Sequence, residues 1–333
     1  MVNEVPAAEA PELLALDWGT THLRAFLMRG GHVLRERQSD AGIQKLPGEG
    51  AARFEQALRE LAGDWLQAWP GLPVIACGMV GSVQGWLEAP YAATPADPQS
   101  LGAQCVRVQA GTVTVHIVPG VLHRPEAGAP DVMRGEETQV AGALLAHPAW
   151  AEGACFVLPG THSKWVVVRG GRIRSLRTFM TGELYAVLRA HSILGRLMPA
   201  DEGRPSPQRQ EAFEAGIAAA RQPQGGGLLH QLFAARTLGL AGGWPHGLLA
   251  DYLSGLLVGA EVYGALQAAN EADEGLPLVL VGAPDLCARY QHALSLLGHA
   301  VAATVENTAP RGLWSVAQAL KWVPAPVNDK EAA

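Results

Sequence analysis

Asp17-Trp18-Gly19-Thr20-Thr21 is a short stretch between two strand-like runs of the sequence, residues 13–17 and 22–28. Both runs are rich in aliphatic residues. The second leads into Arg29-Gly30-Gly31, a turn signal that precedes a third strand-like run at residues 32–37. Glycine lets the backbone approach a polyanion closely, and threonine hydroxyls can donate hydrogen bonds to phosphate oxygens. The stretch therefore predicts a β-hairpin that binds phosphate.

The same opening recurs in the second half of the chain. Leu158-Pro159-Gly160-Thr161-His162 joins strand-like runs at residues 154–158 and 164–169, and the second run again ends in Arg-Gly-Gly, at 169–171. The Gly-Thr pairs are 141 residues apart and the Arg-Gly-Gly turns 140 residues apart, so a single one-residue insertion reconciles them. This repetition predicts two duplicated units of the order β-β-β-α-β-α-β-α. We expect them to face each other across a cleft, with one phosphate-binding hairpin from each.

The remaining elements fit an α/β chain. An amphipathic helix has apolar residues at helical spacing (Phe54, Leu58, Leu61 and Leu66). Further strands are expected at residues 73–77, 112–118, 172–178, 277–281 and 300–304, and further helices at 136–145, 247–270, 285–297 and 311–322. We predict an N-terminal domain over residues 12–125 and a C-terminal domain over 126–323. The tails at 1–11 and 324–333 are rich in Ala, Pro and Glu and are predicted to be disordered.

Composition excludes several classes of protein. The 333 residues carry a net charge of −6, and only 17 % are charged while 48 % are hydrophobic. Lys and Arg form no cluster that could follow a nucleic-acid backbone, so nucleic-acid binding is not expected. The N-terminus is acidic where a signal peptide needs basic residues, and the most apolar helical stretch, at residues 248–260, contains Asp251 and is too short to span a bilayer. We therefore predict a cytoplasmic protein without a membrane partner.

The four cysteines are far apart and follow no metal-binding or disulfide pattern: Cys77, Cys105, Cys155 and Cys287. Buried apolar thiols in a reducing compartment are the expected state.

Several residues are candidates for nucleotide binding. Asp17, at the end of its strand, can hold Mg²⁺ through water, because this ion prefers carboxylate and water oxygens. A third element, the apolar strand 278–281 followed by the small residues Gly282 and Ala283, would leave room for the base and ribose of ATP, although the same pattern is also ordinary α/β architecture. The predicted ATP-binding residues are Gly19, Thr20, Thr21, Gly160, Thr161, Gly282 and Ala283.

Phosphoryl transfer needs a base for the acceptor hydroxyl. Glu136 and Glu137 open the helix predicted at residues 136–145. Neighbouring residues on a helix point about 100° apart, so only one of the two can face the cleft. Acidic residues in a first helical turn can also serve only the helix dipole. We favour Glu136 as base or metal-associated carboxylate and keep Glu137 as the alternative.

An acidic acceptor would need cations in its site. Arginine can hold a carboxylate with two hydrogen bonds, and lysine offers a point charge. The candidates, each equally consistent with a surface charge, are Arg24, Arg134, Lys164 and Arg177. The loop at residues 78–86 follows the carboxyl end of a strand, a usual place for ligand-binding loops. Trp18 and Trp86 could form walls of the pocket or belong to the core.

At this point the sequence resembles the family of 2-dehydro-3-deoxygalactonate kinases. The resemblance rests on motifs that run in order through residues 13–322: Leu16-Asp-Trp-Gly-Thr-Thr-His-Leu-Arg-Ala25, Gly78-Met-Val-Gly-Ser82, Met133-Arg-Gly-Glu-Glu-Thr-Gln139, Pro159-Gly-Thr-His-Ser-Lys-Trp165, Phe179-Met-Thr-Gly-Glu-Leu184 and Ser254-Gly-Leu-Leu-Val-Gly-Ala-Glu261. It implies two ribonuclease-H-like domains of the actin-like ATPase fold, with the nucleotide and the substrate in the cleft between them.

The resemblance also implies an activity. ATP and Mg²⁺ would serve to phosphorylate the 6-hydroxyl of 2-dehydro-3-deoxy-D-galactonate, in galactonate catabolism. The motifs add further expected substrate-binding residues to Trp18, Arg24, Trp86, Arg134 and Lys164, namely Met79, Ser82, His162, Thr181 and Glu183. Related sugar kinases usually have an aspartate as base, whereas here only Glu136 and Glu137 stand near that place.

Other functions stay open from the residues alone. A kinase for a related keto-deoxy sugar acid, or a phosphatase of the same fold, would use a similar site. A non-catalytic sugar sensor would not need the carboxylates of Asp17 and Glu136, and no helix-turn-helix segment precedes Leu13. An actin-like filament protein is a further alternative. The oligomeric state, including a homodimer, is left open.

Overall fold

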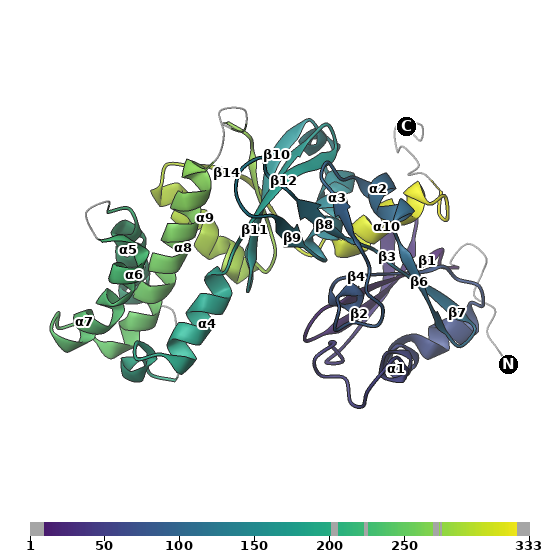
Figure 1. Cartoon of the computed structure of the whole chain (residues 1–333), viewed down its shortest axis with the longest axis horizontal. Helices are drawn as coiled ribbons and strands as arrows, with labels where there is room; N and C mark the ends of the chain where they lie inside the picture. Colours follow the sequence, from purple (N-terminus) through teal and green to yellow (C-terminus); the bar gives the residue numbers. More distant parts are fainter. Residues whose placement is uncertain (1–9, 201–205, 223–225, 269–272, 274, 325–333) are drawn as a thin grey trace. The chain divides into compact units, whose positions relative to one another are not determined.

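The computed structural model describes residues 10–200, 206–222, 226–268, 273 and 275–324 (Figure 1). Residues 1–9 and 325–333 of the two predicted tails lie outside the described residues. Packing divides the chain into two compact units. Unit 1 comprises Met1–Gly153, Val167–Leu176 and Asn307–Ala333, and unit 2 comprises Ala154–Val166 and Arg177–Glu306.

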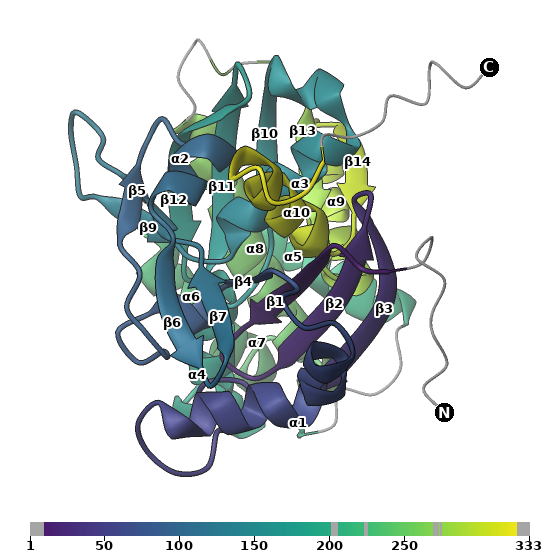
Figure 2. The ribbon, with the colours of Figure 1, turned by 90° about the vertical axis from the view of Figure 1, so that its right-hand side faces the viewer.

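The central sheet of unit 1 begins with the predicted hairpin. Strands β1 (Leu13–Trp18), β2 (Leu23–Arg29) and β3 (His32–Ser39) form an antiparallel meander, and Figure 2 shows them side by side. β4 (Val74–Cys77) then pairs parallel with β1, and β7 (Val113–Ile117) pairs parallel with β4. β6 (Val106–Ala110) completes the order β3-β2-β1-β4-β7-β6.

Helix α1 (Ala52–Ala68) packs on this sheet as its periodicity predicts. Phe54, Leu58 and Leu61 are buried in one hydrophobic core with Leu14 and Leu16 of β1. Removing such apolar side chains from water is the main stabilising contribution to a unit of this kind.

Two further helices of unit 1 come from distant parts of the chain. α3 (Glu136–Ala146) packs against α10 (Ala309–Ala319), which also contacts α2 (Pro98–Ala103) and β1. The two backbones meet at glycines, because a Cβ atom on Gly142 would lie 1.9 Å from the Thr308 carbonyl oxygen and one on Gly312 would lie 1.7 Å from that of Thr138. Any larger residue at either position would therefore force the two helices apart.

A small second sheet in unit 1 was not expected from the sequence. Its strands are β5 (Tyr91–Ala93), β8 (Gly120–His123) and β9 (Asp131–Met133), in the order β5-β8-β9. These strands are three or four residues long, which is too short for a period of two to be read reliably.

Unit 2 contains the second hairpin and most of a five-stranded sheet. The strands are β10 (Gly153–Leu158), β11 (Ser163–Arg169), β12 (Arg172–Phe179), β13 (Leu278–Val281) and β14 (Val301–Val305), in the order β12-β11-β10-β13-β14. β10, β13 and β14 run parallel. The tip of the β11–β12 hairpin belongs to unit 1, where Ile173 exchanges two backbone hydrogen bonds with Ala96.

The helices of unit 2 pack around α8 (Leu249–Gln267). α8 is buried along most of its length and packs against α5 (Pro207–Ala220). The others are α4 (Thr181–His191), α6 (Gly227–Leu232), α7 (Ala234–Leu240) and α9 (Pro284–Leu296). Short 3₁₀ turns occur at Met79–Gly81, Pro148–Ala151, Gly195–Leu197 and His246–Leu248. Within the described residues no helix has the length and apolarity needed to cross a bilayer.

The two sheets confirm the predicted fold class. Numbering the first five strands of each duplicated unit in sequence, and setting the inserted β5 and β6 aside, both sheets have the order 3-2-1-4-5 that is typical of ribonuclease-H-like units. The division of the chain differs from the boundary predicted at residues 125 and 126. Because α3 packs against α10, residues 126–153 and the segment from Asn307 onward fall into unit 1 rather than into the second unit.

Candidate active site

Asp17 lies at the end of β1, where a buried strand opens into the first hairpin. Its register partner on β2 is Arg24, whose Nη2 donates to Asp17 Oδ2 at 2.6 Å. The Asp17 side chain is only 13 % exposed and that of Arg24 is 32 % exposed. Burial raises the pKa of Asp17, the adjacent Arg24 charge opposes that rise, and the negative charge of Glu136 adds to it. Asp17 and Glu136 are therefore electrostatic neighbours.

Two glycines bring the end of β4 and the start of α3 together beside Asp17. Gly78 has φ +90° and Gly135 has φ +110°, conformations that L-residues rarely adopt. A Cβ atom on Gly78 would lie 2.9 Å from the Trp18 carbonyl oxygen and 3.7 Å from Asp17 Oδ1, and one on Gly135 would lie 3.3 Å from Gly78 Cα. This close backbone contact places the first turn of α3 near Asp17.

The two candidate bases at this turn have different environments. Glu136 is half-buried, and its Oε2 accepts a hydrogen bond from the Arg134 backbone N–H at 3.1 Å. Glu137 is fully buried, and both of its oxygens accept from the Gly135 N–H, at 2.9 and 2.7 Å. Burial, with the nearby Glu136 charge, raises the pKa of Glu137 to about 8. The geometry favours Glu136 as the carboxylate that a ligand can reach, while Glu137 is hydrogen-bonded to the backbone at the start of α3.

Glu137→Gln is expected to weaken the pH dependence of stability. The unfolded chain releases this proton near pH 4.5, whereas the folded chain retains it to about pH 8, so wild-type stability falls as pH rises between these values. Glutamine does not titrate, and the variant should gain on wild type by on the order of a few kcal/mol across that window. Urea unfolding at about pH 5 and about pH 8 measures the change. Parallel pH dependences in the two proteins would contradict it.

Arg134 is held at the edge of the same site. Its Nη2 donates to the Ala89 carbonyl oxygen at 2.8 Å, and the guanidinium carbon lies 4.3 Å from the centre of the Tyr91 ring. Nε and Nη1 are buried and have no hydrogen-bond partner among the described residues. In the neighbouring loop Ser82 is buried and donates to the Met79 carbonyl oxygen at 2.8 Å.

The structure corrects the expectation for the two tryptophans. Trp18 is fully buried and donates its indole N–H to the Ala41 carbonyl oxygen at 2.8 Å. Trp86 is 7 % exposed and stacks on Phe54, with ring centroids 5.7 Å apart. Both belong to the hydrophobic core of unit 1. We therefore remove Trp18 and Trp86 from the candidate substrate site.

The tip of the first hairpin is open to solvent. The Gly19 N–H donates to the His22 carbonyl oxygen at 3.0 Å, and a Cβ atom on Gly19 would meet only that oxygen, at 3.8 Å. Thr20 is half-buried, whereas Thr21 is exposed and its hydroxyl lies 2.8 Å from His22 Nδ1. The Gly19 and Thr20 carbonyl oxygens accept from the Ile43 and Gln44 N–H groups, so it is the exposed side of the tip at Thr21 that a ligand can reach.

The second hairpin, in unit 2, has a similar open tip. Gly160 has no heavy atom within 4 Å of a Cβ built on it, and Thr161 and His162 are exposed. Lys164 is buried and its Nζ donates to the His162 carbonyl oxygen at 3.1 Å. The His162 ring also contacts the Glu183 carboxylate at the first turn of α4. Gly160, Thr161, His162, Lys164 and Glu183 are therefore neighbours in the structure.

Three candidates of unit 2 remain, and one of them lies beside the second hairpin, because a Cβ atom on Gly282 would be 3.7 Å from the Pro159 carbonyl oxygen. Gly282 follows β13 with its N–H bonded to the Val305 carbonyl oxygen at 3.0 Å, and Ala283 is exposed at the start of α9. Arg177 is exposed at the end of β12. The exposed turn at Gly282 and Ala283 has the small side chains that the predicted adenosine site requires.

Comparison with known proteins identifies the family. Residues 17–316 match the family model described as 2-keto-3-deoxy-galactonokinase. The chain belongs to this family. It is 39 % identical over 313 residues to the 2-dehydro-3-deoxygalactonokinase of Escherichia coli (strain K12), covering 92 % of this chain and 98 % of that protein.

Solved structures agree with this assignment. A crystal structure of a Sinorhizobium meliloti protein that bears the name of the same kinase superposes with a TM-score of 0.80 at 32 % identity, covering 92 % of this chain and 99 % of the other. A Rhizobium meliloti (strain 1021) protein named "Probable 2-dehydro-3-deoxygalactonokinase DgoK1" is 35 % identical over 315 residues, with 92 % and 96 % covered. A kinase family implies ATP as the phosphoryl donor.

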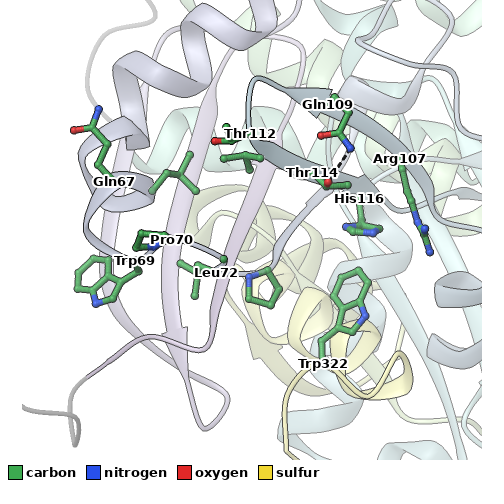
Figure 3. A pocket seen from close by; sticks show the side chains of 14 residues that line it. Gln67, Trp69, Pro70, Leu72, Arg107, Gln109, Thr112, Thr114, His116 and Trp322 are labelled. Carbon is green, nitrogen blue, oxygen red and sulfur yellow. Dashed lines mark hydrogen bonds between the residues drawn. The ribbon is translucent and has the colours of Figure 1, made fainter.

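A pocket of about 980 Å³ in this 2-keto-3-deoxy-galactonokinase family member lies away from Asp17 (Figure 3). Its lining includes Leu72 and Pro73, at the amino end of β4, whereas Asp17 pairs with Cys77 at the carboxyl end. The rings of His116 and Trp322 lie 4.3 Å apart within it. The lining contains no predicted site residue, so we assign it no part in the reaction.

Some features of the kinase site were not recognised in the sequence. Gly78 and Gly135 set the approach of α3 to Asp17, and both stand within motifs quoted from the sequence, where neither was given a role. A glycine after a buried strand and another before two acidic residues at a helix start were the available signals. Cys77 was placed correctly as a buried thiol, as was Cys287, while Cys105 and Cys155 are half-buried, and all four are free. Burial raises the pKa of Cys77 well above its usual range, so this thiol is not a nucleophile.

Proposed function

We propose that this chain uses ATP to phosphorylate the 6-hydroxyl of 2-dehydro-3-deoxy-D-galactonate in galactonate catabolism. Family membership supports the reaction class, and one structural observation supports its location. Asp17 and the half-buried Glu136 are electrostatic neighbours at a backbone junction where a side chain on either glycine would not fit. Two carboxylates in one place suit a reaction that needs both a base and a ligand for a cation.

In the proposed reaction Glu136 removes the proton of the 6-hydroxyl. The hydroxyl oxygen then attacks the γ-phosphorus of ATP, the bond from that phosphorus to the bridging oxygen breaks, and ADP leaves. Arg24 holds Asp17 through the 2.6 Å hydrogen bond, and its charge opposes the rise that burial causes in the pKa of Asp17. The buried Glu137 holds the Gly135 N–H and so keeps Glu136 in place.

The residues present fit Mg²⁺. In the structure Arg24 donates to Asp17 Oδ2, which leaves Oδ1 of Asp17 as an oxygen donor for the ion. Among the described residues no group of three or more His, Cys, Asp or Glu could hold a metal. Mg²⁺ is commonly bound by one or two carboxylates with water and substrate phosphates. Asp17, together with water and the substrate phosphates, would hold the ion, and the ion would supply neutralisation of phosphate charge when bound.

Arg134 of unit 1 is proposed to hold the carboxylate of the sugar acid, and Lys164 of unit 2 stays a separate predicted substrate-binding residue. Two N–H groups of Arg134 have no acceptor among the described residues, and a substrate carboxylate would supply one. A guanidinium already fixed by Ala89 and Tyr91 loses little freedom on binding. Met79 and Ser82 of unit 1, and His162, Thr181 and Glu183 of unit 2, stay predicted substrate-binding residues.

Gly19→Ala and Gly160→Ala are expected to fold normally and to bind ATP at least about tenfold more weakly, because a methyl group would keep a phosphate from approaching the hairpin backbone closely. Neither glycine has positive φ, and neither Cβ would meet an atom closer than 3.8 Å. Gly247→Ala is the matched control, since that glycine also has open space around it. Isothermal titration with ATP and thermal unfolding separate binding from stability. Wild-type affinity in both hairpin variants would contradict the phosphate role of the hairpins.

The proposed function is tested by measuring ADP release with a panel of keto-deoxy sugar acids. Highest kcat/KM for 2-dehydro-3-deoxy-D-galactonate, with phosphorus coupled to the C6 protons of the product by NMR, is the expected result. A preference for another keto-deoxy acid would reassign the substrate. Sugar-acid binding without turnover at any Mg²⁺ concentration would favour the sensor alternative.

The cellular setting follows from the substrates. ATP and the products of sugar-acid catabolism are found in the cytoplasm, and we infer that this chain works there. A homodimer stays a prediction, which light scattering of the purified protein tests.

A further inference from the structure

Unit 2 contains a buried carboxylate that the proposed reaction does not use. Glu261 of α8 is 3 % exposed. Its Oε1 accepts from Trp165 Nε1 at 2.9 Å, and its Oε2 accepts from the Tyr290 hydroxyl at 2.5 Å. Burial raises the pKa of Glu261, while side-chain hydrogen bonds from Thr181, Tyr290, Trp165 and Ser163 act in the opposite direction. Trp165 donates to one carboxylate oxygen and the Tyr290 hydroxyl donates to the other, so both oxygens of Glu261 act as acceptors.

These hydrogen bonds lead to the second hairpin. Ser163 is fully buried, its Oγ lies 2.9 Å from the Tyr290 oxygen, and it accepts from the Gly160 N–H at 3.4 Å. Tyr290 gives its single proton to Glu261, so Ser163 must donate its proton toward the Tyr290–Glu261 side. The lone pairs of Ser163 then face Gly160. A directed chain of donors runs from Gly160 through Ser163 and Tyr290 to Glu261.

A second connection runs through the first turn of α4. Thr181 is 8 % exposed and hydrogen-bonds the Glu261 carboxylate. The next residue, Gly182, packs so closely that a Cβ atom on it would lie 2.5 Å from the Gly160 carbonyl oxygen. The Glu183 N–H donates to the Thr161 carbonyl oxygen at 2.9 Å. The hairpin and the start of α4 are therefore held to one another and to the same carboxylate.

We propose that Glu261 is a positioning residue that fixes the second hairpin in the conformation needed to bind phosphate. The proposal rests on the function proposed above for Gly160 and Thr161. Its basis is that one buried carboxylate joins β11, α4, α8 and α9 directly behind the open tip of the hairpin.

Burying a carboxylate at position 261 of α8 costs free energy, and a positioning role accounts for that cost. An apolar side chain on α8 would pack in this core without the desolvation cost of a carboxylate. A fully satisfied buried network, in contrast, specifies one arrangement of the elements that it joins. The backbone at Gly160 and Thr161 is what this network positions, because the Gly160 N–H donates to Ser163 and the Thr161 carbonyl oxygen accepts from the Glu183 N–H, at the tip that is proposed to contact ATP.

The test uses the full-length protein and three single variants, Tyr290→Phe, Ser163→Ala and Glu261→Gln. Tyr290→Phe keeps the ring and removes the hydroxyl group that is hydrogen-bonded to both Ser163 and Glu261. Glu261→Gln places an NH₂ group against one of the existing donors. The control is Glu214→Gln, which removes the partner of His292 on α9, at 2.8 Å, without touching the network.

Two measurements report on each variant. Hydrogen exchange follows amide protection at residues 160–165 and 181–185 against the rest of the chain. Steady-state kinetics give KM for ATP, KM for the sugar acid and kcat, and thermal unfolding checks that the variant is folded.

Tyr290→Phe and Ser163→Ala should lose protection locally at both segments and should raise KM for ATP by about tenfold, as expected when a hydrogen bond to a positioned group is lost, with KM for the sugar acid nearly unchanged. Glu261→Gln should do the same or more. The Glu214→Gln control should match wild type. Folded Tyr290→Phe and Ser163→Ala proteins with wild-type protection at residues 160–165 would overturn the proposal, and this holds even if Glu261→Gln does not fold. Lost protection with unchanged KM for ATP would keep the positioning role and count against the ATP role of the hairpin.

Discussion

Asp17→Asn is expected to abolish turnover of the sugar acid while the protein stays folded. The substitution removes the charge proposed to hold Mg²⁺ but almost no volume. Asparagine can still accept the hydrogen bond that Arg24 now donates at 2.6 Å. Because burial already raises the pKa of Asp17, the neutral side chain costs the folded state little. The loss should therefore be catalytic rather than structural.

Steady-state kinetics at saturating ATP and thermal unfolding measure the two effects. Asp64→Asn is the matched control, because Asp64 carries the same charge in the same unit and pairs with Arg37 on the surface, 64 % exposed. Such exposed pairs contribute little, so the control should keep its activity. If Asp17→Asn retained more than about a tenth of kcat, a barrier change below ~1.4 kcal/mol, its role in the reaction would be untenable.

Glu136→Gln is expected to lower kcat by roughly 10²–10⁴-fold, the usual effect of losing a general base. Affinity for ATP should change little, since Glu136 is proposed to act on the sugar hydroxyl. The amide can keep the hydrogen bond from the Arg134 N–H, so the start of α3 should be preserved. Single-turnover kinetics and ATP titration separate the chemical step from binding.

Glu137→Gln is the comparison that decides between the two neighbours. Glu137 is fully buried against the Gly135 N–H, so its substitution should reduce kcat much less than that of Glu136. The reverse ranking would make Glu137 the base. It would also mean that α3 changes conformation when substrate binds, because no part of Glu137 is exposed in this structure.

The parts of the fold that depend on local sequence could be predicted. Both Gly-Thr hairpins and their flanking strands follow from apolar runs broken by turn residues, and α1 follows from its apolar periodicity. Most predicted ends lie within two residues of the observed ones, for example 136–145 against Glu136–Ala146 for α3. A duplicated motif adds the order of the strands, because each copy repeats the same topology.

The parts that depend on packing between distant segments could not. Nothing in the sequence of residues 307–324 indicates that α10 packs on α3. This packing is the reason why the observed division of the chain differs from the predicted boundary. Aromatic residues beside a motif do not reveal their exposure, and Trp18 and Trp86 proved to be core residues. Glu261 stood within a recognised motif, yet its function depends on Ser163 and Tyr290, which are 98 residues before it and 29 residues after it in the sequence.

The packing of α10 on α3 also has a consequence for synthesis. Leu313, Trp314 and Ala317 are buried parts of unit 1, so the part of unit 1 that leaves the ribosome first lacks a layer of its core until α10 has been made. At ordinary translation speeds the segment between Gly153 and Asn307 takes roughly 8–30 s to synthesise. During that time the α10-facing surfaces of α3 and β1 are uncovered, while unit 2 is emerging. The nascent chain therefore passes through a period in which the surfaces of α3 and β1 that α10 covers are accessible to chaperones. Synthesis of α10 ends this period.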